Sequence, residues 1–229
     1  DPARNLGFAL NSNGGEVQLF DSVANGGDLL DGVNFGPQLL DLSIGRLADG
    51  SWGLCQPSFG SPNLAQPAAN GETLRLNEWL ASGAPTAPED FVELYNPDPV
   101  PTAMGGLYLS DAPDGSPARH LIAPLSFIPA GGYFAFKADG NTNAGPEHLN
   151  FKLSPSAGSI GLFATDLSEI DCVVYGPQRS GVSQGRSPDG SDELSFFATP
   201  TPGAGNPGAL PIYVTNLTFS LMAYTNVWR

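Results

Sequence analysis

The residues that could bind a metal ion form one short segment. The sequence DGNTNAG (139–145) approaches the opening of a calcium-binding loop, in which alternating Asp and Asn side chains supply oxygen ligands. Its glycine comes one position late, and position twelve is Asn150, where such a loop carries a bidentate Glu. Asp139, Asn141 and Asn143 are therefore weak calcium candidates, and the interpretation that we prefer is an Asx-rich turn.

Side chains for acid–base or nucleophilic catalysis do not form a known pattern. The two histidines, His120 and His148, have no partner at metal-ligand spacing, and we expect structural roles for both. No G-x-S-x-G motif presents a serine nucleophile. Asp111 and Asp114, and the acids at 189–193, could support glycoside hydrolysis, but tight turns also require Asp. We predict that the chain is not an enzyme and has no catalytic or cofactor-binding residue.

The charge of the chain argues against polyanionic partners. Its 229 residues include nine Lys and Arg against 23 Asp and Glu, for a formal net charge of −14. Nucleic-acid binding depends on clustered basic residues that displace phosphate counterions, and an anionic membrane attracts the same residues. No apolar run approaches the roughly 18 residues of a membrane-spanning helix. We expect neither nucleic-acid binding nor membrane insertion.

Short alternating segments separated by turn residues predict an all-β fold. The 29 Gly and 22 Pro residues are spread along the chain, as tight turns between many short strands require. The expected strands are 74–79, 91–95, 107–110, 120–122, 133–137, 149–153, 159–163, 170–175, 183–186 and 194–197. So many short strands fit a β-sandwich. The single helical candidate, 77–81, is short.

An internal repeat organises these elements. Residues 8–63, which we call the first copy, and residues 151–206, the second copy, share one skeleton. The shared positions are Phe8/Phe151, Leu10/Leu153, Gly15/Gly158, Leu19/Leu162, Phe20/Phe163, Asp31/Asp171, Gly36–Gln38/Gly176–Gln178, Gly45/Gly185, Arg46/Arg186, Asp49–Ser51/Asp189–Ser191, Gly60/Gly203 and Asn63/Asn206. About eighty patterned residues precede the second copy and almost none precede the first. We therefore interpret the first copy as the C-terminal half of a domain.

Polar residues within the expected strands allow two interpretations each. In FVELY (91–95), Glu93 either lies on the outer face, which we expect, or is a buried carboxylate that needs a partner. Arg46 and Arg186 each follow a glycine, and we expect them to bond loop carbonyls or a carboxylate across the sandwich, with ligand contact as the alternative. Cys55 and Cys172 are non-equivalent in the repeat, so a bridge between the units and two buried thiols both remain open.

Six blocks of the sequence resemble the lamin-tail domain family of secreted bacterial proteins. They are LRLNEWLAS (74–82), DFVELYNPDP (90–99), GGLYLSDAPDG (105–115), IPAGGYFAFKADG (128–140), LNFKLSPSAGSIGLF (149–163) and SQGRSPDG…TPTPGAGNP (183–207). The resemblance covers 74–207 with all blocks in order, and it implies an immunoglobulin-like β-sandwich. Residues 6–63 resemble only the second half of that domain. At 83–89 the chain lacks the acidic Asp/Gly-rich loop usual in the family, which casts doubt on a metal role for this loop.

The expected organisation is a tandem of lamin-tail-like units whose first copy is incomplete. The C-terminal half of a first unit spans 1–65, a linker spans 66–72 and a complete sandwich spans 73–208. Residues 209–229 are expected to form one or two strands of a following unit, since their last thirteen residues look like the entry strand of a galactose-binding-like sandwich.

We expect a non-catalytic structural or adhesion module of a large multidomain protein that is secreted or displayed at the cell surface. Two alternatives remain. The chain could be a subunit that assembles by strand complementation into a filament or oligomer, or it could supply accessory domains to an enzyme whose catalytic part lies elsewhere. The expected partner is protein, either another copy or a half-domain that completes residues 6–63.

Overall fold

The chain folds into antiparallel β-sheets, which confirms the predicted all-β class. The computed structural model describes residues 7–85 and 89–208. Its helices in these ranges are single 3-10 turns, η1 (Val23–Asn25) and η2 (Thr142–Ala144). Nowhere in the same ranges is a helix long and apolar enough to cross a membrane. The strands expected at 209–229 lie outside the described residues.

Two main sheets, arranged as in a β-sandwich, form the body of the molecule between residues 73 and 208. The larger sheet has the order β12 (Tyr133–Lys137), β7 (Phe91–Tyr95), β6 (Arg75–Leu80), β15 (Ser183–Arg186) and β16 (Leu194–Phe197). The smaller sheet has the order β10 (His120–Leu121), β9 (Tyr108–Ser110), β13 (Gly158–Phe163) and β14 (Glu169–Tyr175). A short pair joins β8 (Thr102–Ala103) to β11 (Phe127–Ile128). Each hairpin of the second copy is therefore extended by strands from residues 73–150, which we call the front segment.

The core lies between these two sheets. Side chains alternate along each strand, so that Leu76, Leu94 and Phe136 of the larger sheet turn inward and are fully buried. Ile160 and Leu162 of β13 meet them from the smaller sheet and are equally buried. Each such side chain stabilises the fold by about 1.5–3 kcal/mol relative to an exposed position.

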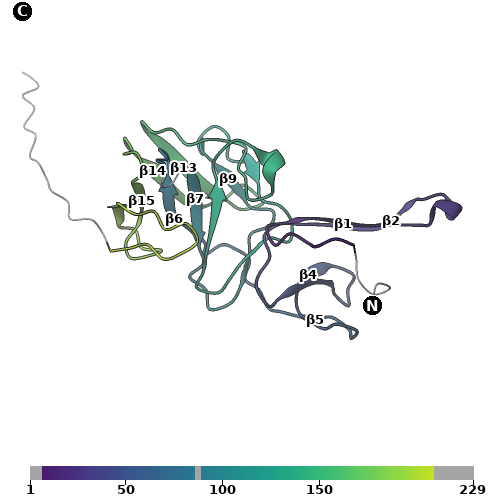
Figure 1. Ribbon diagram of the computed structural model, residues 1–229. Coiled ribbons are helices and arrows are strands. Elements are labelled where there is room, and N and C mark those ends of the chain that lie inside the picture. The colour runs from purple at the N-terminus through teal and green to yellow at the C-terminus, as the bar shows by residue number, and fades with distance from the viewer. Residues whose placement is uncertain (1–6, 86–88, 209–229) are drawn as a thin grey trace, which may run out of the picture.

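The first copy forms its own small sheets without a strand of the front segment beside them. β1 (Gly15–Phe20) pairs with β2 (Leu29–Phe35), and β3 (Ser43–Arg46) pairs with β4 (Trp52–Gln56), which also pairs with β5 (Leu64–Ala65). Figure 1 shows β1 and β2 as an arm that extends away from the two main sheets, with β4 and β5 beneath it.

Equivalent apolar residues are buried in the second copy and exposed in the first. Leu162 is 0% exposed and Phe163 is 5% exposed, whereas Leu19 and Phe20 are 59% and 53% exposed. Both pairs sit at the same register irregularity of their hairpin. The hairpins therefore share a local shape, and the exposure differs because β9 and the opposite sheet cover β13 while no described strand covers β1.

One loop of the first copy contacts the front segment. The Gly36 N–H donates to Pro124 O (2.9 Å), and Gln38 Nε2 donates to Leu125 O (2.9 Å). The linker 66–72 runs alongside β8, to which it is joined by a parallel bridge. The first copy is thus attached to the body by main-chain and side-chain hydrogen bonds of this loop as well as by the covalent chain.

Most of the predicted strands are confirmed, four of them with the expected bounds. The strand expected at 149–153 is wrong, because this segment makes a single isolated bridge, from Lys152 to Asp139. Its alternation arises because Leu149, Phe151 and Leu153 point into the core from a loop. The helical candidate 77–81 is also wrong, since pairing with β7 and β15 outweighs the weak helix preference of so short a segment.

Candidate functional site

Residues that recur in both copies meet at one place between the two main sheets. Arg186, on β15, donates through Nη2 to both carboxylate oxygens of Asp171 on β14, at 2.8 and 2.9 Å. The two side chains are only 5% and 7% exposed. The prediction that this arginine bonds a carboxylate across the sandwich is confirmed.

The same pair also holds the main chain of β6. The Leu76 N–H donates to Asp171 Oδ2 (2.8 Å), and Arg186 Nε donates to Leu76 O (2.8 Å). Hydrogen bonds with one charged partner are stronger than neutral ones. The ion pair therefore fixes the position of β6 against β15, where Gly185 lies opposite Glu78.

Two glutamates lie buried on the adjoining β6–β7 ladder. Glu78 and Glu93 are opposite each other, and both are fully buried. Glu93 points away from the side of β7 on which its core neighbour Leu94 lies, which agrees with the expected outer face. It is nevertheless buried there, so the alternative of a buried carboxylate that needs a partner is the one that holds. Glu93 accepts hydrogen bonds from Asn77 Nδ2 (3.1 Å) and the Gly203 N–H (2.7 Å). Burial raises the pKa of Glu93 to about 8, although these hydrogen bonds act to lower it.

The closing loop, residues 199–206, covers these carboxylates. The Thr201 N–H and Oγ1 each donate to Glu78 Oε2 (3.1 Å), and Ser183 Oγ donates to Glu78 from β15. Burial raises the pKa of Glu78 as well, against the lowering effect of these donors. The glutamates thus act as acceptors that fasten the loop to the larger sheet.

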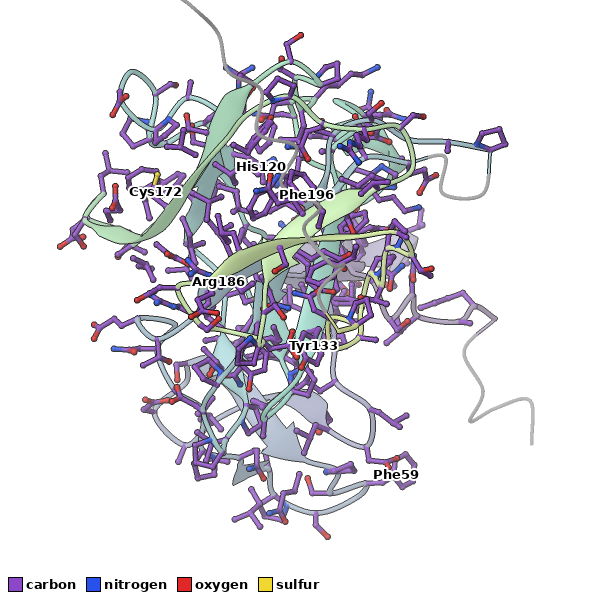
Figure 2. All side chains as sticks on the ribbon, turned by 90° about the vertical axis from the view of Figure 1, so that its left-hand side faces the viewer. Phe59, His120, Tyr133, Cys172, Arg186 and Phe196 are labelled. Atoms are coloured by element: carbon purple, nitrogen blue, oxygen red, sulfur yellow. The ribbon has the colours of Figure 1, made fainter. Side chains whose placement is uncertain are left out.

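Two further polar residues complete the attachment of the loop. Asn206 Nδ2 donates to Asn77 O (3.1 Å) on β6 and to Arg186 O (2.8 Å) on β15. Asp189 accepts from Asn77 Nδ2 (3.0 Å) and from the Tyr133 hydroxyl (2.8 Å). Figure 2 shows Arg186 and Tyr133 in this central region of the molecule. Every one of these polar residues therefore joins strands to one another or to the loop.

The first copy repeats the ion pair at an exposed position. Arg46 Nη2 donates to both oxygens of Asp31, at 2.8 and 2.9 Å, and Nη1 donates to Gly50 O (3.0 Å). The side chains of Arg46 and Asp31 are 45% and 50% exposed. Among the described residues, Arg46 Nε has no acceptor in place of Leu76 O. The guanidinium lies over the ring of Trp52, 4.7 Å from its centroid.

The loop of the first copy has the same shape as the closing loop. Asn63 Nδ2 donates to Arg46 O (2.9 Å), as Asn206 does to Arg186 O. Gly60 and Gly203 both have positive φ, at 76° and 84°, which glycine adopts without strain. Phe59 is fully exposed on this loop, and Figure 2 shows it at the far end of the molecule from His120.

A groove of about 490 Å³ separates the arm from β3 and β4. Its apolar lining consists of Leu10, Val17, Val33, Phe35, Leu42, Ile44 and Trp52. The groove lies where the second copy has its core, because Val17 and Val33 are the equivalents of Ile160 and Val173. The first copy therefore leaves open a groove lined by the equivalents of residues that are buried in the core of the second copy.

The calcium candidates lie in a turn whose leading carboxylate already has partners. Asp139 Oδ1 accepts from the Asn141 N–H (2.9 Å), and Oδ2 lies 2.7 Å from His148 Nδ1. Burial acts to raise the pKa of Asp139, but these hydrogen bonds outweigh it and lower the value. Asn143 lies in η2. Throughout 7–85 and 89–208 no three His, Cys, Asp or Glu residues are grouped as metal ligands. The Asx-rich turn stays the preferred interpretation of this segment, and calcium binding stays the untested alternative.

The second histidine and the cysteines also have defined surroundings. His120 Nδ1 accepts from the Asn150 N–H (3.2 Å), and burial lowers the pKa of His120, which favours the neutral ring. Cys55 and Cys172 are both free thiols, the first buried and the second partly exposed. Burial is the first cause of the raised pKa of Cys172, so its reactive thiolate form is disfavoured.

Sequence reasoning identified both arginines but missed their partners. One signal was present, because Asp31/Arg46 and Asp171/Arg186 are repeated at the same separation of 15 residues. The roles of Glu78, Asn77 and Ser183 carried no comparable signal, since only the meeting of β6 with β15 brings them together.

Comparison with known proteins identifies no relative: no family model, no curated protein and no solved structure matches this chain. The resemblance to lamin-tail domains therefore remains a prediction from the six sequence blocks.

Proposed function

We propose that the chain is a non-catalytic structural module of a large extracellular or cell-surface protein, built from lamin-tail-like, immunoglobulin-like sandwich units in series. The observation that carries this proposal is the Gly-Pro-Gln loop that each copy contains. In the first copy Gly36 and Pro37 are buried against the front segment. In the second copy the equivalent Gly176 and Pro177 are exposed.

This Gly-Pro-Gln loop, which we call the docking loop, has the same internal structure in both copies. Gln38 Nε2 donates to Gly36 O (2.7 Å), and Gln178 Nε2 donates to Gly176 O (2.9 Å). The loop of the second copy is thus already in the shape that docks in the first. A following unit with a segment like 123–127 would seat on it in the same way, which would hold successive units at a regular spacing.

The repeated polar residues support a structural role in place of a catalytic one. Asp171, Arg186 and Asn206 direct their hydrogen bonds to main-chain atoms of neighbouring strands and to one another. Groups that do chemistry need access to a substrate, whereas the side chains of Asp171 and Arg186 are enclosed between the sheets.

A matched pair of glycine variants tests the docking loop. At Gly36 a new Cβ would lie 1.9 Å from Ser126 Oγ, whereas at Gly176 it would meet nothing within 4 Å. Gly36→Ala should therefore increase the maximum dimension measured by small-angle X-ray scattering and speed proteolysis in the linker 66–72. Gly176→Ala should behave as wild type. If Gly36→Ala is also indistinguishable from wild type, the loop does not set the spacing of the units.

The absence of catalysis is tested separately. The purified chain is assayed on nucleotides, esters and glycans, and no turnover is expected. Turnover that a single Asp or His substitution abolishes would overturn the non-catalytic assignment.

A second candidate function is assembly by strand complementation. The specific observation is the exposure of Leu19 and Phe20 on β1 of the arm, which pairs with no described strand but β2. Open strand edges and uncovered apolar faces bind other strands unless they are protected. Light scattering tests this candidate: a chain that remains monomeric and binds no apolar dye would eliminate it.

A further inference from the structure

We infer that the first copy is a binding site for one extended polypeptide strand with the chemistry of β6, in which Leu is followed by Asn and then Glu. This inference rests on the second candidate function, strand complementation, and names its partner. The template lies in the same molecule, because the side chains that hold β6 in the second copy recur in the first around an open strand edge.

The ion pair of the first copy is arranged to hold the main chain of an incoming residue. In the second copy Asp171 accepts the N–H of Leu76, and Arg186 Nε donates to its carbonyl oxygen, both at 2.8 Å. Asp31 and Arg46 keep the same contacts to each other. Within the described residues the other edge of β3 pairs with no strand, so the acceptor and the donor face an open position.

The neighbouring side chains hold the next residue of the strand. Asn206 Nδ2 donates to the carbonyl oxygen of Asn77, and Asn63 occupies the equivalent place with only Arg46 O as its acceptor among the described residues. A Cβ at Gly185 would lie 2.4 Å from Asn77 O, so the strand approaches here as closely as only glycine permits. The first copy retains this glycine, Gly45, although the Asn63 amide also crowds the position.

Two hydroxyl groups define an acidic third position. In the second copy Glu78 is held by Ser183 and Thr201. The equivalents in the first copy are Ser43 and Ser58, whose hydroxyls make only long bonds within their own copy, to Cys55 O (3.4 Å) and to Asn63 Oδ1 (3.3 Å). These hydroxyls are free to turn toward a carboxylate. The preferred strand therefore carries Glu or Asp two residues after the residue held by Arg46.

The apolar groove supplies the remaining contact. Leu76 and Trp79 of β6 are buried in the core of the second copy. These two side chains share a face because the register of β6 shifts between Leu76 and Glu78. The groove of about 490 Å³ beside β3 offers a comparable apolar surface for the equivalent side chains of the incoming strand. An extended strand with the same irregularity as β6 meets all of these requirements together, because it presents a main-chain N–H and C=O, a carboxylate and apolar side chains at fixed positions.

The experiment uses the full chain and a synthetic peptide with the sequence of residues 73–81. Hydrogen exchange followed by mass spectrometry measures protection of β3 and of residues 58–63 as the peptide is titrated. We expect saturable protection, which Arg46→Ala should weaken by about tenfold or more because it removes a charged hydrogen-bond donor. Arg179→Ala removes the same charge from an exposed site and should change nothing. Asp31→Ala provides a second variant at an exposed position and should weaken protection as Arg46→Ala does.

Two altered peptides test which groups are recognised. Methylation of the main-chain nitrogen at the Leu76 position, or replacement of the Glu78 position by Ala, should each reduce protection of β3. Protection that is equal in wild type and Arg46→Ala, or that falls on β15 in place of β3, would overturn the inference.

The same measurements separate this inference from the candidate function on which it rests. A monomeric chain whose β3 is protected by the peptide supports the site and eliminates self-assembly. Concentration-dependent assembly that requires Arg46 but is not inhibited by the peptide would assign the site to a second copy and overturn the strand that we infer.

Discussion

The two copies provide an internal comparison for the energy of one ion pair. Arg186→Ala would leave Asp171 as a buried carboxylate without its main partner, because both side chains are less than a tenth exposed. Breaking a buried pair in this way costs about 3–5 kcal/mol. Arg75 Nη1, 3.8 Å from Asp171 Oδ1, would offset part of that loss. Arg46→Ala breaks a pair that is about half exposed, for which the cost is about 0–1 kcal/mol.

The assay is urea-induced unfolding followed by circular dichroism, with hydrogen exchange to locate the change. Arg186→Ala should lower the free energy of unfolding by several kcal/mol and speed exchange in β6, because Leu76 loses the donor to its carbonyl oxygen. Arg46→Ala should leave the exchange of β6 unchanged. Arg186→Lys keeps the charge but cannot reach Asp171 and Leu76 together, so its stability should lie between those of wild type and Arg186→Ala. Equal costs for Arg186→Ala and Arg46→Ala would refute the assignment of different burial to the two pairs.

Three further predictions concern pH, packing and calcium. Because the pKa of Glu93 is about 8 in the folded chain and near 4.5 in the unfolded chain, the folded chain binds more protons between these values. The contribution of this group to stability is therefore fully present below about pH 4.5 and falls by up to about 5 kcal/mol as the pH rises to 8. Urea unfolding at several pH values should show this decrease in the free energy of unfolding, and Glu93→Gln should remove most of it. A free energy of unfolding that instead rises with pH in wild type, and no longer does so in Glu93→Gln, would contradict the raised pKa. Leu162→Ala should lower the free energy of unfolding by about 2–5 kcal/mol, because its side chain is fully buried. Leu19→Ala, at a 59% exposed position, should lower it by less than about 1 kcal/mol. Equal losses of stability for the two variants in thermal unfolding would show that the arm is covered in solution. Calorimetric titration with calcium should give no saturable heat, since both oxygens of Asp139 already have partners; binding that Asp139→Ala abolishes would reinstate the calcium loop.

Strand positions were largely predictable because they depend on local patterns. Turn residues such as those at 188–190 and alternation in segments such as 133–137 limit the chain to short strands. The repeat added that two distant segments share a local fold, and the equivalent register irregularities in β1 and β13 agree with this. The strand predicted at 149–153 is wrong, because there the alternation of apolar residues comes from side chains that a loop directs into the core.

Polar partners were less predictable because they depend on which strands meet. Alternation along β7 could place Glu93 on either face, and only the closing loop over the larger sheet makes it a buried acceptor. The chemistry of Arg186 was predictable from its type, but the identity of Leu76 as its partner was not, since the two are 110 residues apart.

The sequence by itself determined the all-β class, the turn positions and the repeat of one segment in two copies, because hydrophobic period and turn chemistry act over a few residues. Only the tertiary structure decided what each copy does with the same side chains. In the second copy the front segment lies beside β15, so the ion pair and the glutamates are enclosed and stabilise the fold. In the first copy the equivalent pair meets solvent, because no described strand occupies that edge of β3. Whether the same ion pair stabilises the fold or lies at an open surface therefore depends on its burial and on the strand beside it, and only the assembled sheets determine these.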